Sequence, residues 1–102
     1  MKQDQFDEVL ERRVNYMWDT LSSKAKEYAC GTDNDRLHNF KVAAMVKGET
    51  VQKALWGMMV KHLVSVIDII EGDLEQTQHN IDEKIGDLIN YLVLLEASFK
   101  DK

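Results

Sequence analysis

The stretch "TVQKALWGMMVKHLVSVIDIIEG", residues 50–72, decides the fold, because it predicts one long helix with apolar residues on almost every side. Thr50 is a favoured N-cap residue and Gly72 a favoured residue just past a helix end, so the helix is predicted to span Val51 to Glu71. A helix that is hydrophobic nearly all round lies at the centre of a bundle or is shared with another chain. We therefore expect this helix to be central and the chain to form a homodimer or higher oligomer.

Three further helices are predicted around it, over about residues 3–28, 35–47 and 81–99. Gly48 is predicted to end the second of these, and Glu83 is predicted to occupy the third position of a capping box that begins at Asn80. The helices predicted over residues 51–71 and 81–99 are joined by a short connection, which predicts that these two helices are antiparallel neighbours. The chain has no proline and five glycines in 102 residues. The sequence thus predicts an all-α fold, a single four-helix domain with a long central antiparallel pair.

The composition narrows the class of protein. A net charge of -5 argues against a general DNA- or RNA-binding role, because binding to phosphates normally needs a basic surface. The single cysteine, Cys30, cannot form an internal disulfide, which fits a reducing cytosol. The segment "MKQDQFDEVLERR" lacks the apolar region of a signal peptide, and no apolar run approaches the ~20 residues that span a bilayer. We therefore expect a cytoplasmic protein that does not enter a membrane.

Two polar stripes carry the candidate chemistry. Glu83, Asp87 and Asn90 recur along one side of the fourth helix, and Lys61, Ser65 and Asp68 have the same spacing on the third helix, with His62 beside them. Folding the two helices together brings Asp68 near Glu83 and Lys84, and His62 near Asn90. Carboxylates from two neighbouring helices can share a Mg²⁺ ion that leaves positions open for substrate phosphates.

The same spacing is also typical of two solvated helix faces, and that alternative stays open. The apolar residues Val60, Val64 and Leu94 border the two polar stripes. If the stripes faced water, these residues would also be exposed, on both helices. A partner chain or another helix would cover that surface, and polar groups buried there would need partners or a ligand.

The segment "EKIGDLINYLVLLE", residues 83–96, resembles the second metal-binding helix of the MazG-like all-α nucleoside triphosphate pyrophosphatases, whose motif reads E-E-x-x-D before an apolar run. The succession "YACGTDNDRLHNFKVAA", "GMMVKHLVSVIDII" and "DEKIGDLINYL" further resembles a group of small phage and prophage proteins, over residues 24–97. This resemblance implies a helical oligomer in a bacterial host cell that binds Mg²⁺ and cleaves nucleotides between the α and β phosphates. It places Glu83 and Asp87 on the metal motif, and Asp68 where the preceding helix gives a ligand. Lys84 departs from the second acidic residue of that motif, and His62 and Ser65 stand where the family has an acidic E-x-x-E helix.

Two functions follow from these residues. In the enzyme hypothesis, Asp68, Glu83 and Asp87 hold Mg²⁺, Lys61 and Arg36 neutralise phosphate charge, and His62 orients the nucleophile, so His62 and Asp87 are the candidate catalytic residues. In the binding hypothesis, an oligomer holds a nucleotide or signalling nucleotide between its subunits without cleaving it, as in phage counter-defence or sensing. Lys61, Lys84 and Arg36 would then contact phosphate, and Asp87 and Asn90 the base or ribose. The candidate substrate-binding residues of both hypotheses are Arg36, Asn39, Phe40, Lys61, Ser65, Lys84, Asn90 and Tyr91. A third possibility is a structural interaction protein whose polar stripes serve only assembly.

Overall fold

The computed structural model of the chain describes residues 1–23 and 35–101. This part of the chain holds four α-helices and no strand, which confirms the all-helical prediction: α1 (Gln3–Ser23), α3 (His38–Lys47), α4 (Val51–Glu71) and α5 (Gln78–Lys100). The predicted end of the first helix at residue 28 and the predicted loop around Cys30 lie outside the described residues. No helix in the described part is long and apolar enough to cross a membrane.

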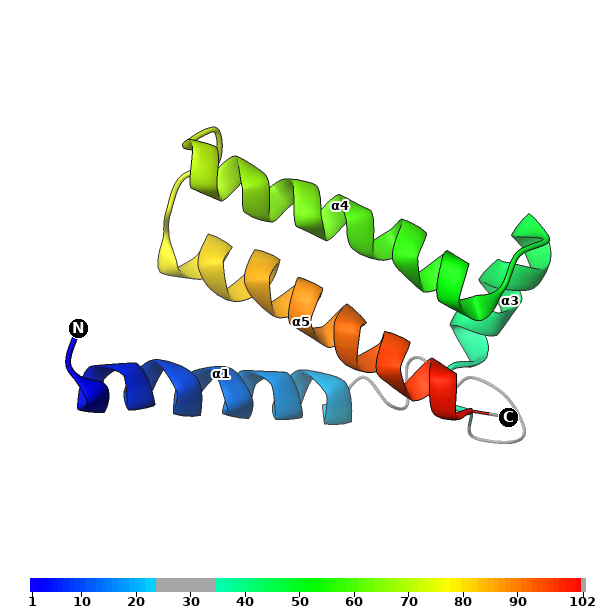
Figure 1. Cartoon of the computed structure of the whole chain (residues 1–102), viewed down its shortest axis with the longest axis horizontal. Coiled ribbons are helices and arrows are strands. Elements are labelled where there is room, and N and C mark those ends of the chain that lie inside the picture. Colours follow the sequence, from blue (N-terminus) through cyan, green and yellow to red (C-terminus); the bar gives the residue numbers. More distant parts are fainter. Residues whose placement is uncertain (24–34, 102) are drawn as a thin grey trace.

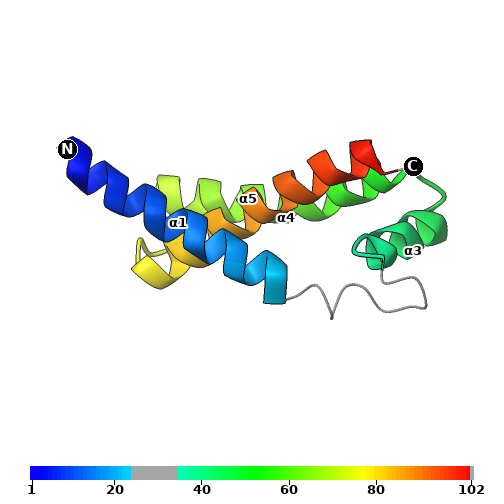
Figure 2. The same ribbon diagram turned by 90° about the horizontal axis from the view of Figure 1, so that it is seen from below.

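The helices are arranged around α5. Figure 1 shows α5 running back alongside α4 after a short connection, with α1 along the other side of α5. The short helix α3 packs against α4 at the opposite end from that connection. Seen from below, α1 crosses in front of α5, and its N-terminal end projects beyond it (Figure 2). Helix α5 is therefore the element that both α4 and α1 contact.

The ends of α4 are those that the sequence predicts. The hydroxyl of Thr50 accepts a hydrogen bond from the Lys53 amide at 3.2 Å, which satisfies one of the free N–H groups of the first turn. At the other end Gly72 adopts a left-handed conformation with φ of 85°, which glycine reaches without steric cost. The prediction of a helix from Val51 to Glu71 is confirmed.

The predicted start of α5 is wrong by several residues. Its N-cap is Thr77, whose hydroxyl accepts a hydrogen bond from the Asn80 amide at 3.1 Å, so Asn80 is already inside the helix. The side-chain amide of Asn80 turns back to the carbonyl of Glu75 at 2.8 Å. Glu83 consequently lies beyond the first turn and does not form a capping box.

Helix α3 also begins later than predicted, at His38 rather than at residue 35. The Asp35 carboxylate accepts a hydrogen bond from the Leu37 amide at 3.0 Å and holds the turn that precedes the helix. Lys41 then joins Asp35 at 2.6 Å and Asp101 at 2.7 Å, and these bonds raise the Lys41 pKa and lower the Asp35 pKa. Gly48, with φ of 67°, ends the helix as predicted.

The core lies where α3, α4 and α5 meet. Leu55 and Met59 are its largest fully buried side chains, and Leu55 joins Leu37, Phe40 and Leu94 in one cluster. Many large apolar side chains remain exposed on every helix, including most of those on α1 and on the outer side of α4. Among the described residues, eight hydrophobic side chains are thus buried, while nineteen large hydrophobic side chains are exposed.

Candidate ligand-binding groove

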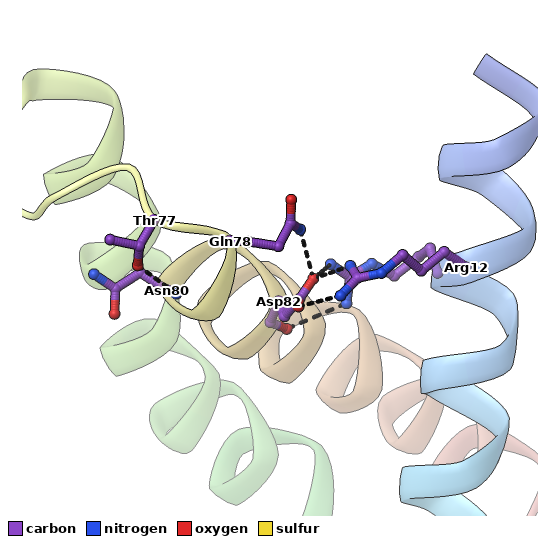
Figure 3. Close-up of polar contacts among 6 residues, drawn as sticks. Arg12, Thr77, Gln78, Asn80 and Asp82 are labelled. Atoms are coloured by element: carbon purple, nitrogen blue, oxygen red, sulfur yellow. Dashed lines mark hydrogen bonds and ion pairs between the residues drawn. The ribbon is translucent and has the colours of Figure 1, made fainter. Parts of the chain in front are cut away.

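A salt bridge fixes α1 against the start of α5. The guanidinium of Arg12 binds both carboxylate oxygens of Asp82, with Nη2 to Oδ2 at 2.7 Å and a second bond from Nη1 to Oδ1 (Figure 3). Gln78 donates to the same carboxylate at 2.9 Å, and Arg13 donates to the Asp82 carbonyl oxygen at 3.2 Å. These bonds, led by the one from Arg12, lower the pKa of Asp82 to about 2. Asp82 is therefore ionised at neutral pH and holds two arginines of α1 to α5.

Gly86 lets the two helices approach one turn further along α5. A Cβ atom at this position would lie 2.7 Å from Nη1 of Arg13, closer than such contacts occur, so the arginine lies directly over the glycine. Glycine inside a helix weakens it relative to alanine, and here the close arginine gives a reason for it. The Asp82 ion pair and Gly86 together set the spacing between α1 and α5.

A groove of about 290 Å³ lies between α1 and α5, and we call it the α1–α5 groove. It adjoins a smaller hollow of about 40 Å³ toward α3, and Thr20, Asp87 and Asn90 line both. The groove is otherwise lined by Arg13, Tyr16, Met17, His79, Asp82, Glu83 and Gly86, and the hollow by Leu21, Arg36, Phe40, Tyr91 and Leu94. Acidic and amide side chains come mainly from α5, while α1 supplies the arginine and the tyrosine of the opposite wall.

A cluster of aromatic rings, His62, Tyr91 and Phe40, extends from Asp87 to α3. His62 of α4 places its Nδ1 atom 3.4 Å from Oδ2 of Asp87, and its ring stacks on Tyr91 with centroids 4.9 Å apart. Tyr91 in turn meets Phe40 of α3 edge to face, at 6.3 Å between centroids. Three helices therefore hold the Asp87 carboxylate and the Tyr91 ring in place.

Asn90 has a polar atom that needs a partner. Its side-chain oxygen Oδ1 is buried and accepts no hydrogen bond from any described residue. A buried acceptor without a partner costs about 1–3 kcal/mol, and such atoms usually bind a protein group, water or ligand. Because Asn90 lines both the groove and the hollow, a bound molecule could supply the missing donor.

Glu83 is the most exposed of the three carboxylates that line the groove, the others being Asp82 and Asp87. Glu83 contacts His79 at 3.0 Å and Lys84 at 3.5 Å, and its side chain is 46% exposed. Lys84 thus lies beside Glu83 rather than across the groove. Glu83 and Asp87 are separated by one helical turn, so their side chains share one wall.

The structure brings together some of the predicted site residues and leaves others apart. Arg36, Phe40, Glu83, Asp87, Asn90 and Tyr91 line the groove or the hollow, and His62 contacts Asp87. Neither cavity is lined by Lys61, Ser65 or Asp68 of α4, and the Ser65 hydroxyl donates instead to the Lys61 carbonyl at 3.2 Å. Asn39 is exposed on α3 and also lines neither cavity. Within residues 1–23 and 35–101, no three His, Cys, Asp or Glu side chains lie close enough together to hold a metal ion by themselves. The predicted set of Asp68, Glu83 and Asp87 is therefore not assembled in the described part of the chain.

Sequence reasoning missed the wall that α1 contributes. The predicted residues do not include Arg13 and Thr20 of this wall, nor Asp82 and Gly86, which position it. Gly86 is the signal that could have found the wall, because a glycine inside an otherwise good helix indicates a close neighbour. No family model, curated protein or solved structure matches the chain. The resemblance to MazG-like pyrophosphatases stays a prediction, and the function is argued from the groove itself.

Proposed function

We propose that the chain is a nucleotide-binding protein and that the nucleotide lies in the α1–α5 groove. A groove of about 290 Å³ lies just below the usual range of small-molecule sites, roughly 300–1,000 Å³. It combines a few polar groups of fixed position with aromatic side chains, as such sites do. The buried oxygen of Asn90 is the single observation that carries the proposal, because a ligand that donates a hydrogen bond there would satisfy it.

The base end of the ligand is assigned to the end of the α1–α5 groove that adjoins the hollow, because the hollow itself, at about 40 Å³, is too small for a nucleobase. Amino groups of bases and hydroxyl groups of ribose are both donors that Asn90 Oδ1 could accept. Aromatic side chains favour contact with nucleobases, with stacking worth about 1–3 kcal/mol per base. Tyr16 lines the groove itself and is the side chain available there for such stacking, whereas Phe40 and Tyr91 line only the hollow.

The phosphate end is assigned to Glu83, Asp87 and Arg13. Phosphates beside two carboxylates repel them unless a cation intervenes, and Arg13 already faces Asp82. Mg²⁺ is commonly bound by one or two carboxylates together with substrate phosphates and water. Glu83 and Asp87 fit that role on one wall of the groove, whereas Asp68 lies outside it. We therefore expect magnesium to enter with the nucleotide, where it would neutralise phosphate charge.

Hydrolysis of the α–β phosphate bond is the second candidate function. It is favoured by His62, which contacts Asp87 in the way that a histidine and a carboxylate pair at many catalytic sites. His62 itself lines neither the groove nor the hollow, so its role toward the ligand is to position Asp87. Binding without cleavage is accordingly the better supported proposal, and MazG-like chemistry is the alternative.

We also propose that the chain works as a homo-oligomer. Exposed apolar side chains on a monomeric protein rarely form large continuous patches, and here they include Trp18 at 70% exposure and Ile70 at 68%. Their number supports self-association, because the described protomer has few buried residues to offset the loss of chain entropy.

Calorimetric titration with nucleoside mono-, di- and triphosphates, with and without Mg²⁺, tests the binding proposal. Asn90→Ala is expected to weaken the best ligand about tenfold, through the loss of one hydrogen bond. Asn39→Ala is the matched control, because Asn39 is exposed on α3 and lines neither cavity. Equal affinities of the two variants, or no binding of any nucleotide by the unmodified chain, would refute the assignment. Release of pyrophosphate that Asp87→Asn abolishes would establish the second candidate.

A further inference from the structure

The outer side of α4 carries a second apolar face that nothing in the described protomer covers. Its central positions recur at spacings of four and three residues, and we call them the α4 seam: Lys53, Gly57, Val60, Val64, Ile67 and Glu71. Trp56, Leu63 and Ile70 flank the seam on one side, and the six large apolar residues of this face are between 37% and 68% exposed. The opposite side of the same helix holds Leu55 and Met59 in the core.

The spacing of the seam is that of a helix that packs against another helix. Alternation of four and three residues keeps one line of side chains facing a partner along the whole helix. Apolar residues at both seam positions and at one flanking position form the stripe of a bundle-facing helix. Helix α4 shows this stripe on its outer side although its inner side already packs on α5.

Gly57 supports the same conclusion. Glycine in the middle of a helix weakens it relative to alanine, and a Cβ atom at Gly57 would meet no atom within 4 Å. Its φ is not positive, so the backbone does not require glycine there. Nothing among the described residues therefore explains this glycine, whereas the close approach of a second helix would.

The charges at the two ends of the seam select the partner and its direction. Lys53 and Glu71 are eighteen residues apart, which is five helical turns, so they lie on one line about 27 Å apart. Neither forms a salt bridge with another described residue. Parallel packing of two copies would place like charges together, whereas antiparallel packing places Lys53 beside Glu71 of the partner subunit at both ends.

We propose that two copies of this chain associate through their α4 seams, packed antiparallel about a two-fold axis that crosses the seam midway between Val60 and Val64. In that register Gly57 faces Ile67 of the partner subunit, so the smallest seam residue meets the largest aliphatic one. Val60 likewise faces Val64 of the partner subunit. The surface is self-complementary in shape and in charge, as a two-fold interface requires. This inference gives a location to the self-association proposed above and is independent of nucleotide binding.

A charge exchange tests both the seam and its direction. Lys53→Glu and Glu71→Lys each place like charges at both ends of the homodimer, so each variant alone is expected to dissociate about tenfold more readily. In a parallel dimer the charges at each end are already alike in the unmodified chain, so neither single variant would weaken it. The double variant Lys53→Glu/Glu71→Lys restores opposite charges at both ends of an antiparallel dimer, and native mass spectrometry over a dilution series should show it to dimerise about as well as the unmodified chain. Single variants that dimerise like the unmodified chain would overturn the antiparallel arrangement.

A second pair of variants tests whether the seam is the interface at all. Val64→Glu buries a charge in the proposed contact and is expected to give a monomer by light scattering at micromolar concentration. Val46→Glu is the matched control, because Val46 is 78% exposed on α3 and outside the seam. A dimeric Val64→Glu variant would overturn the seam while leaving self-association intact. A monomeric unmodified chain at tens of micromolar would overturn both, and the nucleotide titration would still stand on its own.

Discussion

Replacing Asp82 by asparagine should loosen α1 from the rest of the molecule without unfolding the core. The asparagine oxygen can still accept hydrogen bonds from Arg12 and Gln78, and the Asp82 carbonyl that binds Arg13 is a backbone group and does not change. The variant therefore removes the charge and one of the two hydrogen bonds from Arg12, because the amide nitrogen that replaces one carboxylate oxygen cannot accept. Most of the described side chains of α1 are exposed, so this ion pair is a large part of what holds the helix.

The size of the effect follows from the geometry of the pair. An exposed ion pair contributes about 0.2–1 kcal/mol, and binding through both carboxylate oxygens puts a pair at the upper end of that range. The Arg12 side chain is 46% exposed and that of Asp82 only 11%, so solvent still screens the arginine. We take about 1 kcal/mol, which increases the fraction of molecules with α1 undocked about fivefold.

Hydrogen exchange of the α1 backbone amides measures this fraction directly. Because Arg12 also lies over the Tyr16 ring at 5.1 Å, its own loss removes two interactions, so a double-mutant cycle of Arg12→Gln with Asp82→Asn isolates the ion pair. Asp73→Asn in the connection between α4 and α5 is the matched control. A coupling energy near zero would refute the view that Asp82 holds α1.

The same ion pair predicts a pH dependence. The pKa of Asp82 is about 2 in the folded chain and near 3.8 without its partners, so the unfolded state binds the proton more readily. The stabilisation is then fully present above pH 4 and is lost as the pH falls from about 4 to about 2. The protection factors of the α1 amides, which correct for the intrinsic pH dependence of exchange, should fall through this interval in the unmodified chain and change less in Asp82→Asn.

Three further substitutions test other parts of the fold. Leu55→Ala removes a fully buried side chain and should lower the free energy of unfolding by about 2–5 kcal/mol in a urea titration. Thr77→Ala removes the N-cap of α5 and should cost about 0.5–2 kcal/mol by the same measurement, while an unchanged stability would argue against this helix start. Gly86→Ala displaces the flexible end of the Arg13 side chain, so α1 amides should exchange faster while the urea midpoint changes little. Slower exchange in that variant would contradict the close contact between Arg13 and Gly86.

The parts of the fold that depend on neighbouring residues could be predicted from the sequence. Thr50 and Gly72 bound α4 because a capping hydroxyl and a left-handed glycine act within one turn. The start of α5 was missed because Thr77 and Asn80 are both good caps three residues apart. The sequence does not reveal that the Asn80 amide binds the Glu75 carbonyl and leaves the capping role to Thr77.

The sequence predicts only one of the two walls of the candidate site. The spacing of Glu83, Asp87 and Asn90 identified the face of α5 that lines the groove. From the sequence, the opposite wall is assigned to α4, because the short connection predicts that α4 and α5 are neighbours. The connection does not indicate which element covers the side of α5 that faces away from α4. The structure places α1 there, through the contact of Arg12 with Asp82, seventy residues away in the chain. A contact over that separation leaves no periodic signal in the sequence.

The two proposed surfaces use different sides of the helices that form the core. Helix α5 presents one side to α4 and another to the α1–α5 groove, while α4 presents its inner side to α5 and its outer side to the seam. No residue of the seam lines the groove, so substitutions in one surface should leave the other nearly unchanged, as independent sites add in free energy. His62 lies on α4 and contacts Asp87, so it joins the helix of the proposed interface to a carboxylate of the groove. If self-association and ligand binding influence each other, the rotation or shift of α4 that carries the influence must therefore move His62 against Asp87 and Tyr91.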